Sequence, residues 1–138
     1  MKSSLKTQVV RRAKGCCEYC LSQSEFSHDD FSVEHIFPKS LGGTDELENL
    51  ALSCQACNNR KFTAISAIDP VTGKVVLLFH PRLDEWSAHF MWIEDFSEIA
   101  GISPIGRATV NCLKLNRFGL VNLRAALHQA NCHPPDYP

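Results

Sequence analysis

Apolar and polar residues near the start of the chain recur with a helical period. Leu5, Val9 and Val10 fall on one face of residues 5–15, and cations fall on the other face. Gly15 stands where a helix C-terminal cap belongs. The pattern predicts a short amphipathic helix, followed by the tight knuckle CCEYC and a polar loop.

The middle of the chain has strand character. FSVEHIFP, residues 31–38, is rich in β-branched and aromatic residues and stops at Pro38, which favours a strand. A loop with a Gly-Gly turn follows, and after it the short apolar run LALSC. We expect CNNRKFTAISA, residues 57–67, to form a helix that begins at a cysteine.

The second half of the chain alternates between strand and helix patterns. VVLLFH predicts a buried strand at 75–80, and HFMWIEDFSEIAGI predicts a hairpin at 89–102. Ser103 followed by Pro104 is typical of a helix start, because the hydroxyl caps the first turn and proline fits within it. Asn116 is the expected cap of a last helix.

The organisation of the chain favours one domain. Residues 1–138 contain no internal repeat, low-complexity segment or Gly/Ser/Pro-rich linker. We expect residues 14–67 to form a core and residues 68–138 to form a C-terminal extension. The tail after Ala130 is expected to fray.

Charge gives no support to a nucleic-acid partner, because the formal charge is −1 and the pI is about 6.6. A dedicated nucleic-acid-binding domain often has a pI above ~9. The distribution is less neutral, since five cations precede the first acidic residue. They form either a polyanion-binding face or the solvated side of a helix. These cations are Lys2, Lys6, Arg11, Arg12 and Lys14.

Composition and hydropathy indicate a cytoplasmic protein that does not enter a membrane. The longest apolar run, residues 75–79, is far shorter than the ~20 apolar residues of a spanning helix. The basic N-terminus lacks the apolar stretch of a signal peptide. In a reducing compartment disulfides are rare, and seven cysteines is an odd number.

Two C-x-x-C motifs predict a metal site. Cys17 and Cys20 form one motif, and Cys54 and Cys57 form the other. Four thiolates suit a closed, structural, tetrahedral Zn²⁺ site. Cys16 could replace Cys17, but only the 17/20 pair repeats the spacing of 54/57. Four buried free cysteines or a redox pair are the alternatives, and no parallel-sheet pattern accompanies the motifs.

Between and beside these motifs lies an ordered set of polar residues. It comprises Glu34-His35, the Gly-Gly turn, Asn49, and Asn58 directly after Cys57. In this order the set resembles the HNH endonuclease family. The resemblance implies an α+β fold with a zinc-braced ββα-metal core, the HNH or His-Me finger, and a mixed strand–helix C-terminal extension.

The resemblance also implies a role for each residue. His35 would be the general base that takes a proton from the attacking water. Glu34 and Asn58 would bind a catalytic divalent metal, and Asn49 would hold His35 in its working orientation across the loop. The family more often has Asp and His where this chain has Glu34 and Asn58, and the neutral amide oxygen favours Mg²⁺ or Mn²⁺.

The partner implied by the resemblance is DNA. Lys39, Arg60 and Lys61 are the candidate phosphate-binding residues. The expected activity is therefore metal-dependent hydrolysis of DNA phosphodiester bonds, by nicking or by double-strand cleavage. The oligomeric state is left open by the sequence.

Two competing functions use the same cysteines. A non-catalytic zinc module that binds nucleic acid keeps the four thiolates but has no use for His35, Asn49 and Asn58 together. An iron–thiolate electron carrier also keeps the thiolates, and it would be coloured. An absorbance spectrum separates the iron protein from the zinc protein.

Overall fold

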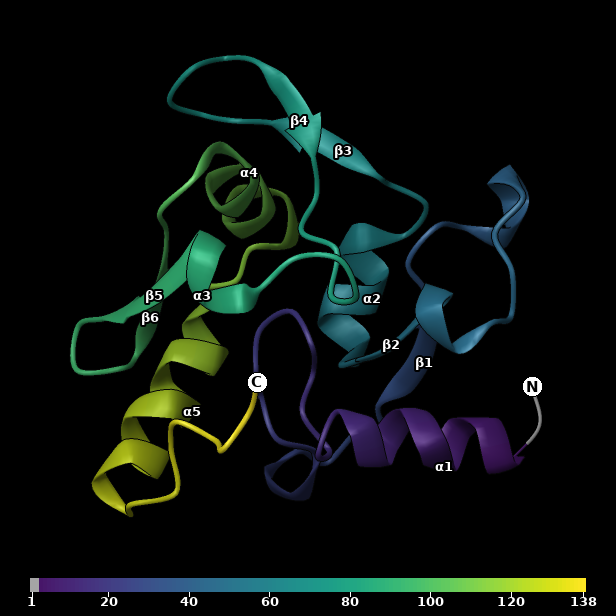
Figure 1. Cartoon of the computed structure of the whole chain (residues 1–138). Helices are drawn as coiled ribbons and strands as arrows, with labels where there is room; N and C mark the ends of the chain where they lie inside the picture. The colour runs from purple at the N-terminus through teal and green to yellow at the C-terminus, as the bar shows by residue number, and fades with distance from the viewer. Residues whose placement is uncertain (1–2) are drawn as a thin grey trace.

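The computed structural model describes residues 3–138, so Lys2 of the basic N-terminal run lies outside the described residues. The helices are α1 (Ser3–Arg12), α2 (Gln55–Lys61), α3 (Trp86–His89), α4 (Pro104–Leu113) and α5 (Phe118–Gln129). The strands are β1 (Ser32–His35), β2 (Leu50–Ser53), β3 (Ser66–Ile68), β4 (Val75–Leu77), β5 (Phe90–Ile93) and β6 (Glu98–Gly101). They pair antiparallel as β1–β2, β3–β4 and β5–β6, and the result is the expected mixture of helices and small sheets (Figure 1).

Helix α1 confirms the amphipathic N-terminal helix, with Val9 buried. Lys14 and Gly15 after it are both left-handed, with φ of 52° and 73°, and the Gly15 amide closes the helix end by donating to the Val10 carbonyl at 3.0 Å. One cation of the basic run turns inward. Arg12 donates from Nη1 to the Leu47 carbonyl at 3.0 Å and from Nη2 to the Leu50 carbonyl at 2.6 Å. It therefore ties α1 to the start of β2.

The hairpin β1–β2 and helix α2 follow one another in the ββα order that the resemblance implies. In the hairpin His35 pairs with Leu50. Strand β1 ends at His35, before the predicted end at Pro38. After His35 the chain turns into the loop, and one ladder-like bond, from the Ile36 amide to the Asn49 carbonyl at 2.9 Å, continues beyond the strand.

Two predicted elements differ from the structure between residues 57 and 80. The helix expected over 57–67 ends at Lys61, because Phe62 takes a φ of 47° and the chain then enters β3. The strand expected over 75–80 pairs only at Val75–Leu77, and its side chains are not buried as a set. The β3–β4 ribbon has two strands and projects from the molecule, so a face of each strand meets solvent (Figure 1).

The helix–strand pattern of the extension is otherwise confirmed. Strands β5 and β6 form the predicted hairpin, and Ser103 caps α4 by accepting a hydrogen bond from the Gly106 amide at 2.9 Å. Asn116 is not the cap of α5. Its side chain instead bonds both backbone groups of Ile99 on β6, at 2.7 and 2.9 Å, and Arg117 occupies the cap position.

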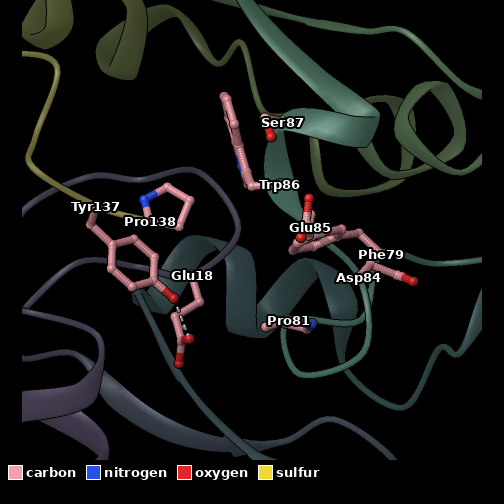
Figure 2. Close-up of a pocket in the computed structure, with 9 residues that line it drawn as sticks. All are labelled: Glu18, Phe79, Pro81, Asp84, Glu85, Trp86, Ser87, Tyr137 and Pro138. Atoms are coloured by element: carbon pink, nitrogen blue, oxygen red, sulfur yellow. Dashed lines mark hydrogen bonds between the residues drawn. The ribbon is translucent and has the colours of Figure 1, made fainter.

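The tail after Ala130 was expected to fray, and this expectation is wrong. Polar contacts attach the tail to the rest of the chain. Tyr137 donates its hydroxyl to Oε1 of Glu18 at 2.5 Å (Figure 2). His133 contacts the Phe96 carbonyl through Nε2 at 2.8 Å. The chain end consequently lies near the middle of the molecule (Figure 1).

One cluster of buried apolar side chains includes residues from both halves. Leu50 and Leu52 of β2 belong to it together with Phe79, Phe90 and Ile99 of the extension. The extension therefore adds to the hydrophobic core beneath the ββα segment. Within residues 3–138, the structure contains no helix with the length and hydropathy to cross a membrane.

Candidate functional site

The four predicted cysteines gather in one cluster. Cys17 and Cys20 lie on the knuckle after α1, Cys54 caps α2, and Cys57 lies in its first turn. All four are buried, and their sulfur atoms lie within 4.8 Å of one another. Helix α2 is thus fixed at its N-terminus by two members of the cluster.

The geometry of the cluster fits a tetrahedral metal. Bonds of ~2.3 Å from Zn²⁺ to four thiolates place the sulfurs about 3.8 Å apart. The sulfurs of Cys20 and Cys54 are 3.7 Å apart. Cys16 is not part of the cluster, and its thiol donates instead toward the Lys14 carbonyl. Cys17, and not Cys16, is thus the residue that lies with the other three cysteines.

The predicted general base and both predicted ligands of the catalytic metal line one open pocket of about 330 Å³. Glu34 and His35 enter it from the end of β1, and Asn58 enters it from α2. Because Asn58 directly follows Cys57, the metal cluster also fixes Asn58 relative to β1. The remaining lining residues are Val33, Pro38, Lys39, Ser40, Phe62 and Thr63.

Glu34 is a buried lining residue of this pocket and is 5% exposed. Tyr19 donates its hydroxyl to Oε1, and the ammonium of Lys61 lies 3.7 Å from Oε2. Burial raises the pKa of Glu34, and Lys61 and Tyr19 oppose that rise by stabilising the carboxylate.

Lys61 is buried rather than presented to solvent. Its side chain is 2% exposed, and its ammonium also donates to the Ile36 carbonyl at 2.9 Å. The expectation that Lys61 contacts DNA is at odds with this burial. Its contacts make it the positive partner of Glu34. Arg60 and Lys39, by contrast, are exposed.

His35 has a partner that sequence reasoning missed. Its Nε2 lies 2.7 Å from Oδ1 of Asp45, and its side chain is 22% exposed. This hydrogen bond lowers the pKa of Asp45 below its ordinary range. Lys39 approaches the other carboxylate oxygen at 3.4 Å. The only sign of this contact in the sequence is that an acidic residue follows shortly after the Gly-Gly turn. That turn returns the chain toward β1.

Asn49 fastens the loop that joins His35 to Asp45. Its Oδ1 accepts from the Phe37 amide at 2.8 Å, and its Nδ2 donates to the carbonyls of Phe37 at 3.0 Å and Thr44 at 2.9 Å. The same loop requires glycine at position 43, because a Cβ there would lie 1.8 Å from the Phe37 carbonyl oxygen. Asn49 thus bonds across the loop without touching His35.

A second pocket, also of about 330 Å³, lies between the first knuckle, α3 and the tail (Figure 2). Its buried acid, Glu18, is already bonded by Tyr137, by Arg82 and by the Leu52 amide. Asp84 accepts from the His80 amide at 2.9 Å. The described lining of this second pocket contains no histidine, whereas His35 lies beside Glu34 and Asn58 in the first, so we place the candidate active site at the His35 pocket.

Comparison with known proteins gives one family match. Residues 17–63 match the family model described as HNH endonuclease. The matched range, about a third of the chain, contains the four clustered cysteines, Glu34, His35, Asn49, Asn58 and the three candidate phosphate-binding cations. No curated protein and no solved structure matches the chain.

Proposed function

We propose that the protein is a metal-dependent endonuclease that hydrolyses phosphodiester bonds of DNA. The observation that carries the proposal is the shared pocket of Glu34, His35 and Asn58, which joins a candidate base to two oxygen donors. The match of residues 17–63 to the HNH endonuclease family supports a nuclease independently of the pocket.

His35 would act as the general base. An imidazole titrates near neutral pH, and the partial exposure of this one admits water to the ring. With Nε2 engaged by Asp45 at 2.7 Å, the nitrogen left for the attacking water is Nδ1. Asp45 would act as a positioning residue, since it fixes the ring and favours the form with the proton on Nε2.

Glu34 and Asn58 would hold Mg²⁺ or Mn²⁺ through oxygen atoms. When bound, such a cation stabilises the charge that grows on the phosphate and on the leaving oxygen. Lys61 would keep Glu34 ionised despite its burial, and Tyr19 would fix the direction of the carboxylate by its hydrogen bond. Asn49 would maintain the loop geometry on which both His35 and Asp45 depend.

Lys39 and Arg60 would bind phosphates on either side of the scissile bond. Both are exposed, and Lys39 also lines the pocket. Because the pocket holds one candidate base, we expect a single chain to nick one strand more readily than to cut two.

The test is nicking of a supercoiled plasmid by the zinc-loaded protein with Mg²⁺, with Mn²⁺ or with EDTA. We expect cleavage that needs the divalent cation and is lost in His35→Ala. His28→Ala is the matched control, because the His28 side chain is 96% exposed and lies outside the pocket. A folded, zinc-loaded protein that binds DNA without cleaving it would instead support the non-catalytic zinc module.

A further inference from the structure

We propose that Arg117 of the C-terminal extension is a direct partner of the cysteine cluster, and that retention of the metal depends on it. Its Nη1 lies 3.6 Å from the sulfur of Cys57, and its Nη2 lies 3.7 Å from the sulfurs of both Cys54 and Cys57. One guanidinium therefore spans the second knuckle.

The guanidinium is held in this orientation by the backbone of the extension. Nη1 also donates to the Leu113 carbonyl at 2.9 Å and to the Lys114 carbonyl at 3.1 Å. These carbonyls close the C-terminus of α4, while Arg117 itself occupies the N-terminal cap position of α5. The junction of the two helices thus fixes the cation against the sulfurs.

The chemistry of the cluster gives this contact a purpose. Four thiolates around one Zn²⁺ leave two net negative charges in a buried position, and such charge requires compensation. Two other groups contact the sulfurs. The Cys57 amide donates to the Cys54 sulfur at 3.4 Å, and the Ser22 hydroxyl oxygen lies 3.1 Å from the Cys20 sulfur. Arg117 supplies a full positive charge, which neither of those groups carries.

A second arginine of α5 supports the first knuckle in a different way. Arg124 is buried and donates from Nη2 to the carbonyls of Cys20 at 3.3 Å and Leu115 at 2.8 Å. It reaches the backbone of the knuckle, whereas Arg117 reaches sulfur. Helix α5 is therefore docked on both knuckles, but of these two arginines only Arg117 acts on the thiolates.

The inference concerns the metal cluster and does not depend on the nuclease proposal. Its consequence reaches the active site all the same, because Cys57 precedes Asn58. A change at Arg117 that loosens the cluster would also loosen α2 at the pocket.

The test compares Arg117→Met and Arg117→Lys with the wild-type chain. Release of zinc to a chromogenic chelator is followed in folded protein, and the sulfur-to-cobalt charge-transfer bands are recorded after Co²⁺ substitution. We expect release from Arg117→Met to be about 10-fold faster, as is usual when a group bonded to a metal ligand is lost. The cobalt bands should also shift, because the thiolates lose a hydrogen-bond donor.

Arg107→Met is the matched control. Arg107 is also an arginine of the extension, and it forms a two-pronged ion pair with Asp69 at 2.9 Å, away from the cysteines. We expect that variant to lose stability without moving the cobalt bands. Arg117→Lys keeps the positive charge but loses the two guanidinium nitrogens that contact sulfur. Its rate of zinc release should fall between those of wild type and Arg117→Met.

The proposal is overturned if folded Arg117→Met and Arg117→Lys retain zinc like wild type and leave the cobalt bands in place. If Arg117→Met does not fold, an unchanged Arg117→Lys overturns it alone. A wild-type chain that binds no metal would overturn it as well. Plasmid nicking tests the nuclease proposal separately from all of these outcomes.

Discussion

The ammonium of Lys61 lies 3.7 Å from Oε2 of Glu34, and each side chain is at most 3% exposed. The pair joins the last turn of α2 to the end of β1, beside the pocket that Glu34 lines. A buried carboxylate left without its cation is costly, because neither water nor a counter-charge replaces the lost interaction. The pair is therefore a structural condition for the site as well as a part of its chemistry.

Removal of the cation should expose that cost. We expect Lys61→Met to lower the free energy of unfolding by roughly 3 kcal/mol, the size typical of breaking a buried ion pair. Urea denaturation of the zinc-loaded protein measures the loss. The same change should raise the pKa of Glu34 further, because Lys61 is the strongest of the groups that oppose the rise caused by burial.

The double variant Glu34→Gln/Lys61→Met separates the pair from ordinary packing. Glu34→Gln keeps the shape of the side chain and removes its charge, so the loss in the double variant should be well below the sum of the single losses. Strictly additive losses would contradict an interaction between the two groups.

The side chain of Asn49 makes three hydrogen bonds across the loop from Phe37 to Thr44. Asn49→Ala leaves the Phe37 amide without its acceptor, and we expect a loss of about 2 kcal/mol in unfolding free energy. Hydrogen exchange of the Phe37 amide should accelerate by more than exchange in α5. Asn49→Asp keeps an acceptor for that amide and should protect it better than Asn49→Ala does, if the loop is held as described.

Some elements of the fold are encoded by local sequence, and others are not. The cysteine spacing, the Ser103 cap and the β5–β6 hairpin each depend on residues close together in the chain, and the structure confirms all three. The end of α2 at Lys61 and the start of β3 depend on pairing with β4, which local propensity does not contain.

The same distinction applies to the pocket. Glu34, His35 and Asn58 were expected to meet because the resemblance supplies their arrangement, and they line one pocket. The Asp45 contact with His35 depends on how the loop returns, and Lys61 points inward because α2 presents that face to β1. Neither the register of a loop nor the buried face of a seven-residue helix can be read from charge alone.

Asp45 should matter for the rate rather than for DNA affinity. We expect Asp45→Ala to slow nicking by roughly 10- to 100-fold, part of the ~100- to 10,000-fold that general-base catalysis contributes. Asp29→Ala is the matched control, because Asp29 is also an acid near a histidine but lies 4.0 Å from exposed His28. Single-turnover rates and binding of plasmid in EDTA are measured for both variants.

The hydrogen bond from His35 lowers the pKa of Asp45. That pKa sets how the contribution of Asp45 to stability depends on pH. A carboxyl with a lowered folded pKa stabilises the fold above its unfolded value of ~3.9, and the contribution is lost as pH falls through the folded pKa. Asp45 therefore stays ionised near neutrality, and the loss of unfolding free energy in Asp45→Ala should shrink only as pH falls below about 4. A loss that shrinks instead between about pH 8 and about pH 6 would contradict the assignment.

Neighbouring cysteines offer the sharpest test of the metal cluster. Cys17 belongs to the cluster, whereas the Cys16 thiol faces the Lys14 carbonyl, and both residues are buried. We expect Cys17→Ala to lose zinc and to unfold, since a structural zinc site contributes ~10 kcal/mol or more to folding. Cys16→Ala should retain one zinc per chain, measured by atomic absorption after gel filtration, and should keep its helical circular dichroism. Retention of zinc by Cys17→Ala together with its loss from Cys16→Ala would assign the first knuckle to the wrong cysteine.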